Sequence, residues 1–487
     1  MAGTGGGPEP QPTPSLTLLM VGPDAIEGDV RAGQYFILDT DTMKQVVGSQ
    51  AEVTDNYKEY LGEITWSIVD GDSIASIDAG SSTEGSVSIS GSDDFTVRAV
   101  VNGEYVEKTA TATYYITDFY ITSLADLQEL QRVINNSLES TISLTQNTSS
   151  SYVATNGNGL SGAHLRLTND INCNSTNLHI GYCYHSADLT DLTKFKAFRG
   201  IFDGAGYRIY NIGGTITSHS VQSTHIDTCL FEALCYAKLF NFSVEGSVIK
   251  NSYTNTIFGY AKYCDVKRIY TNIYYDRTTN NSTNQYVLPA YLFANSTVDS
   301  MCFNDNQYGA RTATCSTWPQ NDTFSRIISL TTSYNIGSNA STSFGLCCPN
   351  PPCTIENFMA INYLQSDKTY GNHNNGGVYG ISANVANGAV MTNCYFVHNG
   401  GSCSSNYTWA IRTGGKTATK TNCFFDSNKH GGDVSSDEGA TGKTTAQLKS
   451  GNIFGGNANW IEKSGYYPLL NIQFAVRPEV LAAIRVS

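Results

Sequence analysis

The stretch from Phe198 to Ile212 reads FRGIFDGAGYRIYNI and decides the fold expected for this chain. Aromatic and β-branched residues favour strands, so we expect one strand at 200–202, around Phe202, and a second at 207–212. Between them, Asp203 is a typical turn residue, while Gly200, Gly204 and Gly206 allow close approach or unusual backbone angles. The run therefore predicts two short strands that meet at a tight turn.

Looser versions of this pattern recur along the chain. Apolar or aromatic pairs open successive segments at 230–231, 257–258, 292–293, 344–346 and 378–379. Three later strands carry a cysteine before an aromatic residue, at Cys302, Cys394 and Cys423. Repeats of this length are typical of solenoids. We expect their asparagines to stack and hydrogen-bond along the axis, and the three cysteines to stack inside as small apolar residues.

A single amphipathic helix is expected at 123–135. Its apolar residues stand at 124, 127, 130, 133 and 134, and Ser123 is a suitable N-cap. A helix there would cover the open end of a solenoid, whose strand edges would otherwise remain unpaired. At the other end, the segment 441–449 and the strand YYPLL at 466–470 resemble the closing segment of a β-helix family, and this resemblance implies that a short helix and the strand seal the solenoid.

The order of this helix, the string LTNDI at 167–171, the string GIFDGAGY and the loose repeats resembles a known family. It is similar to the β-helix region of bacterial and phage surface proteins with GLUG-type repeats, which occur in adhesins, in phage fibres and as non-catalytic parts of secreted peptidases. The resemblance implies an all-β chain with a right-handed parallel β-helix over 119–472.

The N-terminal region has a different pattern. Residues 1–14 form a Gly/Pro-rich arm, and residues 15–118 alternate short apolar runs with turns, as about seven strands of a β-sandwich would. The string ITWSIVDGDSIASI at 64–77 resembles bacterial immunoglobulin-like domains, which implies such a domain here. Residues 473–487 are left over as a tail that could dock onto a partner.

Composition excludes two classes of partner. Only 15% of residues are charged, the net charge is −13, and no basic run occurs, so nucleic acid is not expected to bind. No segment approaches the roughly 18 apolar residues of a membrane span. The start of the chain lacks the basic and apolar parts of a secretion signal, which favours a virion surface over a secreted or bacterial cell-surface location.

Thirteen cysteines occur, all between Cys173 and Cys423. An odd number argues against a complete disulfide framework. Cys347, Cys348 and Cys353 could be metal ligands or form a local disulfide, but no partner CxxC pair is present. We therefore expect no metal and no cofactor, and cysteines that act mainly as buried apolar residues.

Catalysis was weighed because β-helices host polysaccharide lyases and glycosidases. A glycosidase needs two carboxyl groups across a groove. Candidates on neighbouring coils are Asp203, Asp227, Glu232, Glu245 and Asp265. Asp203 is better explained by its turn, and neither the cations nor the clustered acids of a lyase are evident. The sequence predicts a chain without catalytic residues that is not an enzyme, with a tailspike-like depolymerase as the alternative.

The expected function is that of a surface fibre, decoration protein or adhesin, most simply a phage virion component. The N-terminal arm or immunoglobulin-like domain would attach it to other virion or cell-surface proteins, and a homotrimer is one assembly that would suit it. Aromatic side chains could bind host glycans by stacking. The candidates are Tyr182, Tyr184, Tyr274, Tyr275, Tyr308 and Trp318.

Overall fold

The computed structural model divides into two compact units, Thr117–Ile472 and Met1–Ile116 together with Gln473–Ser487. In the unit that contains Met1–Ile116, which we call the N-terminal unit, the structure describes seven strands between Ile37 and Tyr114. In the first it describes residues 117–470 with gaps at 137–141, 148–149, 151, 154–157, 184–194, 217–226, 251–254, 277–289, 309–311, 314–320, 331, 335–341, 344–345, 348–352, 366–377, 384–386, 400–407, 412–416, 430–439, 458, 463 and 466.

The N-terminal unit consists of antiparallel strands. One sheet contains β3 (Glu63–Asp70), β6 (Phe95–Asn102) and β7 (Glu107–Tyr114). Two further pairs are β4 (Ala75–Ser81) with β5 (Glu84–Ile89), and β1 (Ile37–Leu38) with β2 (Gln45–Val46). These short strands agree with the predicted alternation of apolar runs and turns, whereas the immunoglobulin-like assignment and the Gly/Pro-rich arm stay predictions.

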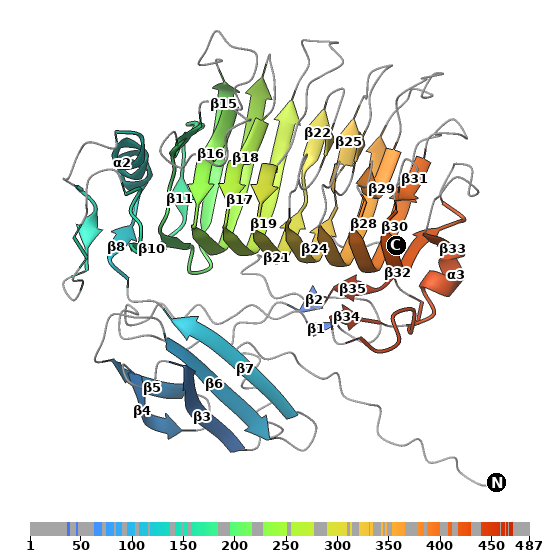
Figure 1. The fold of residues 1–487 in the computed structure, drawn as a ribbon, viewed down its shortest axis with the longest axis horizontal. Coiled ribbons are helices and arrows are strands. Elements are labelled where there is room, and N and C mark those ends of the chain that lie inside the picture. The colour runs from blue at the N-terminus through green and yellow to red at the C-terminus, as the bar shows by residue number, and fades with distance from the viewer. Residues whose placement is uncertain are drawn as a thin grey trace. The chain divides into compact units, whose positions relative to one another are not determined.

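The larger unit is a solenoid of parallel strands, which confirms the predicted β-helix-like, all-β fold (Figure 1). Successive coils contribute to a long sheet that contains β8 (Phe119–Ile121), β10 (His164–Leu167), β14 (Ile201–Asp203), β17 (Lys238–Lys250), β19 (Asp265–Asp276), β21 (Thr297–Phe303), β24 (Thr323–Ser329), β28 (Thr354–Gln365), β30 (Val390–Asn399), β32 (Thr419–Asp426) and β33 (Thr441–Lys443). The same sheet includes β9 (Thr145–Gln146), β11 (Ile171–Asn172), β15 (Arg208–Ile216), β22 (Asn306–Tyr308) and β25 (Thr332–Tyr334).

Further parallel sheets form another side of the coils. One contains β16 (Asp227–Cys235), β18 (Asn255–Lys262) and β20 (Ala290–Ala294). Another contains β23 (Thr312–Ala313), β26 (Thr342–Ser343), β27 (Leu346–Cys347), β29 (Val378–Ala383) and β31 (Thr408–Ile411). A small antiparallel pair, β12 (Tyr182–Cys183) with β13 (Phe195–Lys196), lies beside the first coils.

Rows of identical register build the core. One row runs from coil to coil through the middle of the short strands, and each of its members is at most 4% exposed: Phe119, Leu165, Phe202, Leu239, Val266, Val298, Phe324, Ile355 and Met391. Since side chains alternate along a strand, this row faces inward and its neighbours face outward. The row ends at Lys420, which pairs with Met391 and is half-buried.

The predicted turn in the stretch 198–212 is confirmed. Asp203 ends β14, and its Oδ1 accepts a hydrogen bond from the backbone N–H of Ala205 at 2.8 Å. Gly206 has a φ of +82°, which glycine adopts without strain. A Cβ on Gly204 would lie 2.2 Å from Phe242 Cβ, so the next coil approaches the turn too closely for any side chain.

The long strands bend at one residue per coil. The residues at this bend share the left-handed conformation, with φ between +52° and +62°: Asn241, Arg268, Ser300, Arg326, Asn357, Asn393 and Asn422. Asn422 Nδ2 donates to Asn393 Oδ1 at 3.0 Å, and Asn393 Nδ2 lies 3.5 Å from Asn357 Oδ1. The predicted asparagine stack along the axis is therefore present at the last three coils.

The predicted stack of three cysteines is only partly right. Cys394 and Cys423 are register partners and both lie in the core. Cys302 instead pairs with Ile328, and this row continues through Met359 to Tyr395. Tyr395 follows Cys394 by one residue on its strand. A shift of one residue turns a side chain to the opposite face of the sheet, so Cys302 lies outside the row that holds the other two cysteines, although it is also buried.

Helix α2 (Leu124–Asn135) starts at Ser123, whose side chain accepts a hydrogen bond from Asp126 N, as predicted. Its residues Leu127, Leu130, Val133 and Ile134 are buried in the core. The helix therefore packs against the first coils of the solenoid (Figure 1).

The C-terminal segment differs from the prediction that it seals the far end. Its strands β34 (Trp460–Ile461) and β35 (Leu469–Leu470) form an antiparallel pair, preceded by the one-turn helix α3 (Thr445–Leu448). Strand β35 lies against β24 and β28, and Tyr395 Oη donates to the carbonyl of Pro468 at 2.6 Å. The segment thus covers the outer face of the long sheet, where Met359 and Tyr395 are buried.

Candidate functional site

One corner of the solenoid carries an unusual pair of residues. Tyr236, Tyr263, Asn295 and Asn321 occupy the same corner on successive coils, because the strands on both sides of them share one register. All four have left-handed backbones, with φ between +51° and +57°. Asparagine tolerates this conformation well, whereas a bulky aromatic residue does so rarely.

The two tyrosines are the solvent-facing part of this corner. Tyr236 is 56% exposed and Tyr263 is 40% exposed. Their rings stack with centroids 4.8 Å apart and planes 12° apart. Lys262 Nζ lies 5.0 Å from the centroid of the Tyr263 ring, within the range of a cation–π contact. Tyr236, Tyr263 and Lys262 are called the tyrosine corner below.

Stability alone does not account for tyrosine at these positions. A left-handed backbone costs a non-glycine residue about 1–2 kcal/mol, and an aromatic pair contributes about 0.5–1.5 kcal/mol beyond its buried area. Two strained residues therefore cost at least as much as one stack contributes. The next two coils use asparagine, and Asn321 Nδ2 donates to Asn295 Oδ1 at 2.7 Å. Exposed aromatic rings on strained backbone mark a candidate binding surface.

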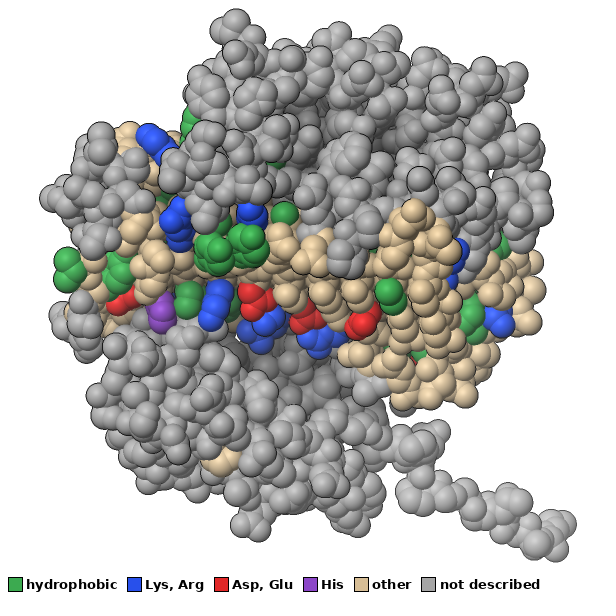
Figure 2. All heavy atoms as spheres, viewed as in Figure 1, with side chains coloured by type: hydrophobic (Ala, Val, Ile, Leu, Met, Phe, Trp, Pro, Cys, Tyr) green, Lys and Arg blue, Asp and Glu red, His purple; other side chains and the backbone are tan. Residues whose placement is uncertain are grey.

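Cations are numerous on the coils that carry the tyrosine corner. Within residues 199–204, 236–241 and 262–268 there are five cations and two carboxylates (5 − 2 = +3): Arg199, Lys238, Lys262, Lys267 and Arg268 against Asp203 and Asp265. Of these cations, Lys262 is buried and Lys267 forms an ion pair with Asp265. The same positions of the following coils, 294–300, 321–326, 353–357, 389–393 and 417–422, hold two cations and three carboxylates (2 − 3 = −1). Figure 2 shows one face of the described residues, where Lys and Arg side chains lie near a hydrophobic patch and a row beside it alternates Asp and Glu with Lys and Arg.

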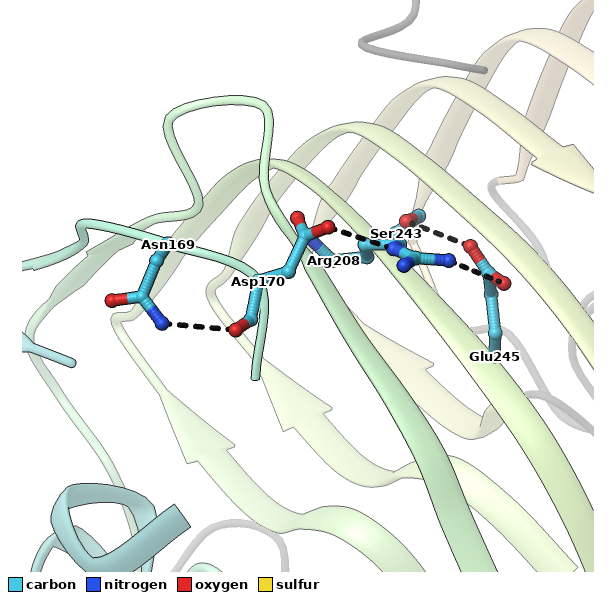
Figure 3. Close-up of polar contacts among 5 residues, drawn as sticks. All are labelled: Asn169, Asp170, Arg208, Ser243 and Glu245. Atoms are coloured by element: carbon cyan, nitrogen blue, oxygen red, sulfur yellow. Dashed lines mark hydrogen bonds and ion pairs between the residues drawn. The ribbon is translucent and has the colours of Figure 1, made fainter. Parts of the chain in front are cut away.

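A second polar cluster lies on the face of β15 and β17 (Figure 3). Arg208 Nε donates to Asp170 Oδ2 at 2.9 Å, and its Nη1 lies 3.7 Å from Glu245 Oε2. Ser243 Oγ lies 3.5 Å from Glu245 Oε1, and the guanidinium stands 4.4 Å from the ring centroid of Tyr210. One arginine thus bridges carboxylates from different coils, an arrangement that stabilises their stacking.

The carboxylates weighed for catalysis also have basic neighbours. Arg166 Nε lies 3.9 Å from Asp203 Oδ2, Lys267 Nζ lies 2.7 Å from Asp265 Oδ2, and His179 Nδ1 lies 4.0 Å from Glu232 Oε2. Each of these three carboxylates, like Glu245 beside Arg208, therefore has a basic group within 4.0 Å. The side chain of Asp227 lies outside the described residues.

The predicted glycan-binding residues fare unevenly. Tyr274 is 39% exposed, and Tyr182 is half-buried in β12. Tyr275 is fully buried, so the prediction that it binds glycans is wrong. Side chains alternate along a strand, and Tyr275 faces inward where Tyr274 faces outward. Tyr184, Trp318 and the side chain of Tyr308 lie outside the described residues.

Sequence reasoning missed Tyr236 and Tyr263, although a signal exists. They stand 27 residues apart, as do Phe231 and Phe258, which open their coils and stack at 6.5 Å. Each precedes an inward-facing residue of the next strand by three positions, Leu239 or Val266. Equal offsets from two matched positions would have placed both tyrosines at one corner.

The interior holds one unusual acid. Asp305, between β21 and β22, is 1% exposed. Its Oδ1 accepts hydrogen bonds from Ile273 N at 2.9 Å and Thr271 Oγ1 at 3.0 Å, while its Oδ2 has no hydrogen-bond partner in the described part of the chain. Burial raises the pKa of Asp305 to about 7, although both hydrogen bonds act to lower it.

Buried thiols fill other interior positions. Seven cysteines within the described ranges are free and buried, Cys353 among them. Burial raises the pKa of Cys173 and the pKa of Cys264 to about 12. Over the same ranges, no three His, Cys, Asp or Glu side chains gather as a metal site. The side chains of Cys347 and Cys348 lie outside these ranges, so a metal site and a local disulfide both stay predictions for that pair.

In the part of the chain that the structure describes, no helix has the length and apolar character needed to cross a membrane. No family model and no curated protein matches the sequence. The resemblance to GLUG-repeat proteins and immunoglobulin-like domains therefore stays a prediction.

A search of solved structures finds a chain titled "IgA1 Protease", with a TM-score of 0.37 and 12% identity. The alignment covers 76% of this chain and 26% of that chain, so this chain spans about a quarter of its length. The expectation that the chain is not an enzyme is withdrawn as a correction, since the matched chain is titled a protease; a likeness at this TM-score supports no particular activity for this chain. It identifies no catalytic residue here, and the activity of that protein is not transferred.

Proposed function

We propose that this chain is a surface-displayed β-helix that binds glycans, in the manner of a fibre, decoration protein or adhesin. The observation that carries the proposal is the tyrosine corner, where Tyr236 and Tyr263 are exposed on strained backbone. Aromatic rings and nearby polar groups suit sugars, whose C–H faces pack on rings while their hydroxyls take hydrogen bonds.

The location proposed for it is a virion surface, with a bacterial cell surface as the alternative. The N-terminal arm or the N-terminal unit would attach the chain to other surface proteins, and the solenoid would present its coils to host glycans. A gene neighbourhood of capsid and tail genes supports the virion, and one of sorting and secretion genes supports the cell surface.

The test measures binding of the whole chain to immobilised bacterial capsule and surface polysaccharides. The double substitution Tyr236→Asn and Tyr263→Asn keeps a residue that tolerates the corner, as Asn295 and Asn321 do. We expect it to weaken binding by about 10- to 100-fold, since loss of each aromatic contact costs roughly 0.5–1.5 kcal/mol and two are lost. Val153→Asn, an exposed apolar residue away from the tyrosine corner, is the control and should bind as the wild type does. Unchanged binding in the double variant would remove the basis of the proposal.

The same incubations show whether glycan is also cut. A tailspike-like depolymerase would release oligosaccharides with new chain ends, which a binding protein leaves intact. Binding with release would add an activity to the tyrosine corner, and substitution of single carboxylates such as Glu245 would then locate it.

A further inference from the structure

We infer that the glycan bound at the tyrosine corner is acidic, carrying a carboxylate or other anionic group on its sugars. The inference rests on the proposed glycan binding and adds the chemical class of the ligand. Its basis is the juxtaposition of exposed tyrosine rings with cations on three consecutive coils of an otherwise acidic protein.

The charge around the corner is local. The whole chain carries −13, yet the corner and adjoining short strands of these three coils carry five cations and two carboxylates. Lys238 follows Tyr236 by two positions, and Lys267 and Arg268 follow Tyr263 by four and five. In the register of the sheet, Lys238 pairs with Asp265, so these side chains belong to adjacent strands.

The geometry separates rings from charges in a way that suits a sugar acid. The tyrosines lie at the corner, and the outward residues of the next short strand begin two residues later. Two residues along an extended strand span about 6.6 Å, which is close to the width of one sugar ring with its substituent. A pyranose beside the rings can therefore direct a carboxylate toward Lys238, and a further sugar of the same polymer reaches toward Arg268, five residues or about 16 Å beyond Tyr263.

The downstream coils provide an internal contrast. At the same corner Asn295 and Asn321 replace the tyrosines, and the matching positions of the following coils hold two cations against three carboxylates. Rings and surplus positive charge thus disappear together after the third coil. This coincidence favours a single ligand that uses both features.

The experiment compares acidic polysaccharides with their neutral counterparts. Polygalacturonate, alginate and polysialate are each tested beside the same polymer after its carboxyl groups have been reduced to alcohols. We expect the whole chain to bind at least one acidic form about tenfold or more tightly than its reduced form, with affinity that falls as salt rises from 50 to 500 mM.

Variants assign the effect to residues. Lys238→Gln with Arg268→Asn should remove the preference for the acidic form and leave binding of the reduced form unchanged. Arg326→Asn, at the same bend on a coil without tyrosines, is the matched control and should keep the preference. Tyr236→Asn with Tyr263→Asn should weaken both forms.

The outcomes separate the two proposals. Equal binding of acidic and reduced forms, lost in the tyrosine variant, would overturn the acidic ligand and leave glycan binding standing. If no tested or host polysaccharide binds, the glycan proposal itself fails. Equal affinity for single-stranded DNA of similar charge density would overturn the inference by showing that charge alone is recognised.

Discussion

Asp305 shows how a single residue inside the solenoid sets a pH dependence. Its ordinary pKa of 3.8 is raised to about 7 by burial. The unfolded chain therefore loses this proton at lower pH than the folded chain does. From about pH 4 to pH 7 the folded form holds the extra proton, so the free energy of unfolding falls as the pH rises, and levels off above 7.

Asp305→Asn should remove this dependence. The amide can keep an oxygen toward Thr271 and Ile273 and does not ionise. At pH 8 we expect the variant to be more stable than the wild type by a few kcal/mol at most, and near pH 4 the two should converge. Urea unfolding of the solenoid between pH 4 and pH 8 measures this. Parallel curves for both proteins would contradict it.

The buried cysteines should be chemically inert in the folded protein. Burial holds the pKa of Cys173 and that of Cys264 near 12, so thiolate at pH 8 is scarcer by about a thousandfold than in an unfolded chain. We expect iodoacetamide to leave both unlabelled under native conditions and to label both in urea, as read by peptide mass spectrometry. Fast native labelling of either would show that the interior opens.

Helix α2 meets the segment 179–181, which forms the first edge beside β16. Ile180 pairs with Phe231 on one side. On the other side, Gln131 Oε1 accepts from His179 N at 2.7 Å, and Asn135 Oδ1 accepts from Gly181 N at 2.9 Å. Two amide side chains, one helical turn apart, thus satisfy backbone groups that another strand would otherwise pair. These bonds support the predicted capping role.

Removing one of these amides tests that role. Gln131→Ala leaves the N–H of His179 without its partner, which costs about 1–3 kcal/mol where the group is buried. Gln128→Ala, on the exposed face of the same helix, should change stability by less than about 0.5 kcal/mol. Thermal unfolding compares them. Equal stability of the two variants would show that the helix end contributes no cap.

At the scale of the whole solenoid unit, segments far apart in the sequence depend on each other. Trp460 Nε1 donates to Asn357 Oδ1 at 3.1 Å, across 103 positions, and Tyr467 hydrogen-bonds Asp426. The outward residues Ile328, Met359 and Tyr395 of three coils are buried on this face. The C-terminal segment is therefore part of the fold, because without it an apolar sheet face would meet water.

Leu470→Ala should loosen this segment. The residue is 2% exposed, and truncation of a buried leucine costs about 2–5 kcal/mol. We expect a lower unfolding midpoint together with increased binding of a hydrophobic dye before unfolding begins. Val153→Ala, at 77% exposure, should change neither. A stable variant that binds no dye would show that the segment is dispensable.

Local patterns in the sequence determined much of this architecture. The spacing of apolar residues and Ser123 predicted helix α2, and Asp203, Gly204 and Gly206 predicted the turn of the coil. These features depend on neighbouring residues only, so a single run of sequence contains the necessary information.

Only the tertiary structure decided which residues stack. Loops of unequal length leave the coils, so the register of one coil on the next cannot be counted along the sequence, and one residue of shift reverses a side chain. Register separated Cys302 from Cys394 and Cys423, brought Tyr236 onto Tyr263, and laid β35 against an outer face instead of an end. The candidate site is a product of that stacking, which is why local sequence patterns alone did not reveal it.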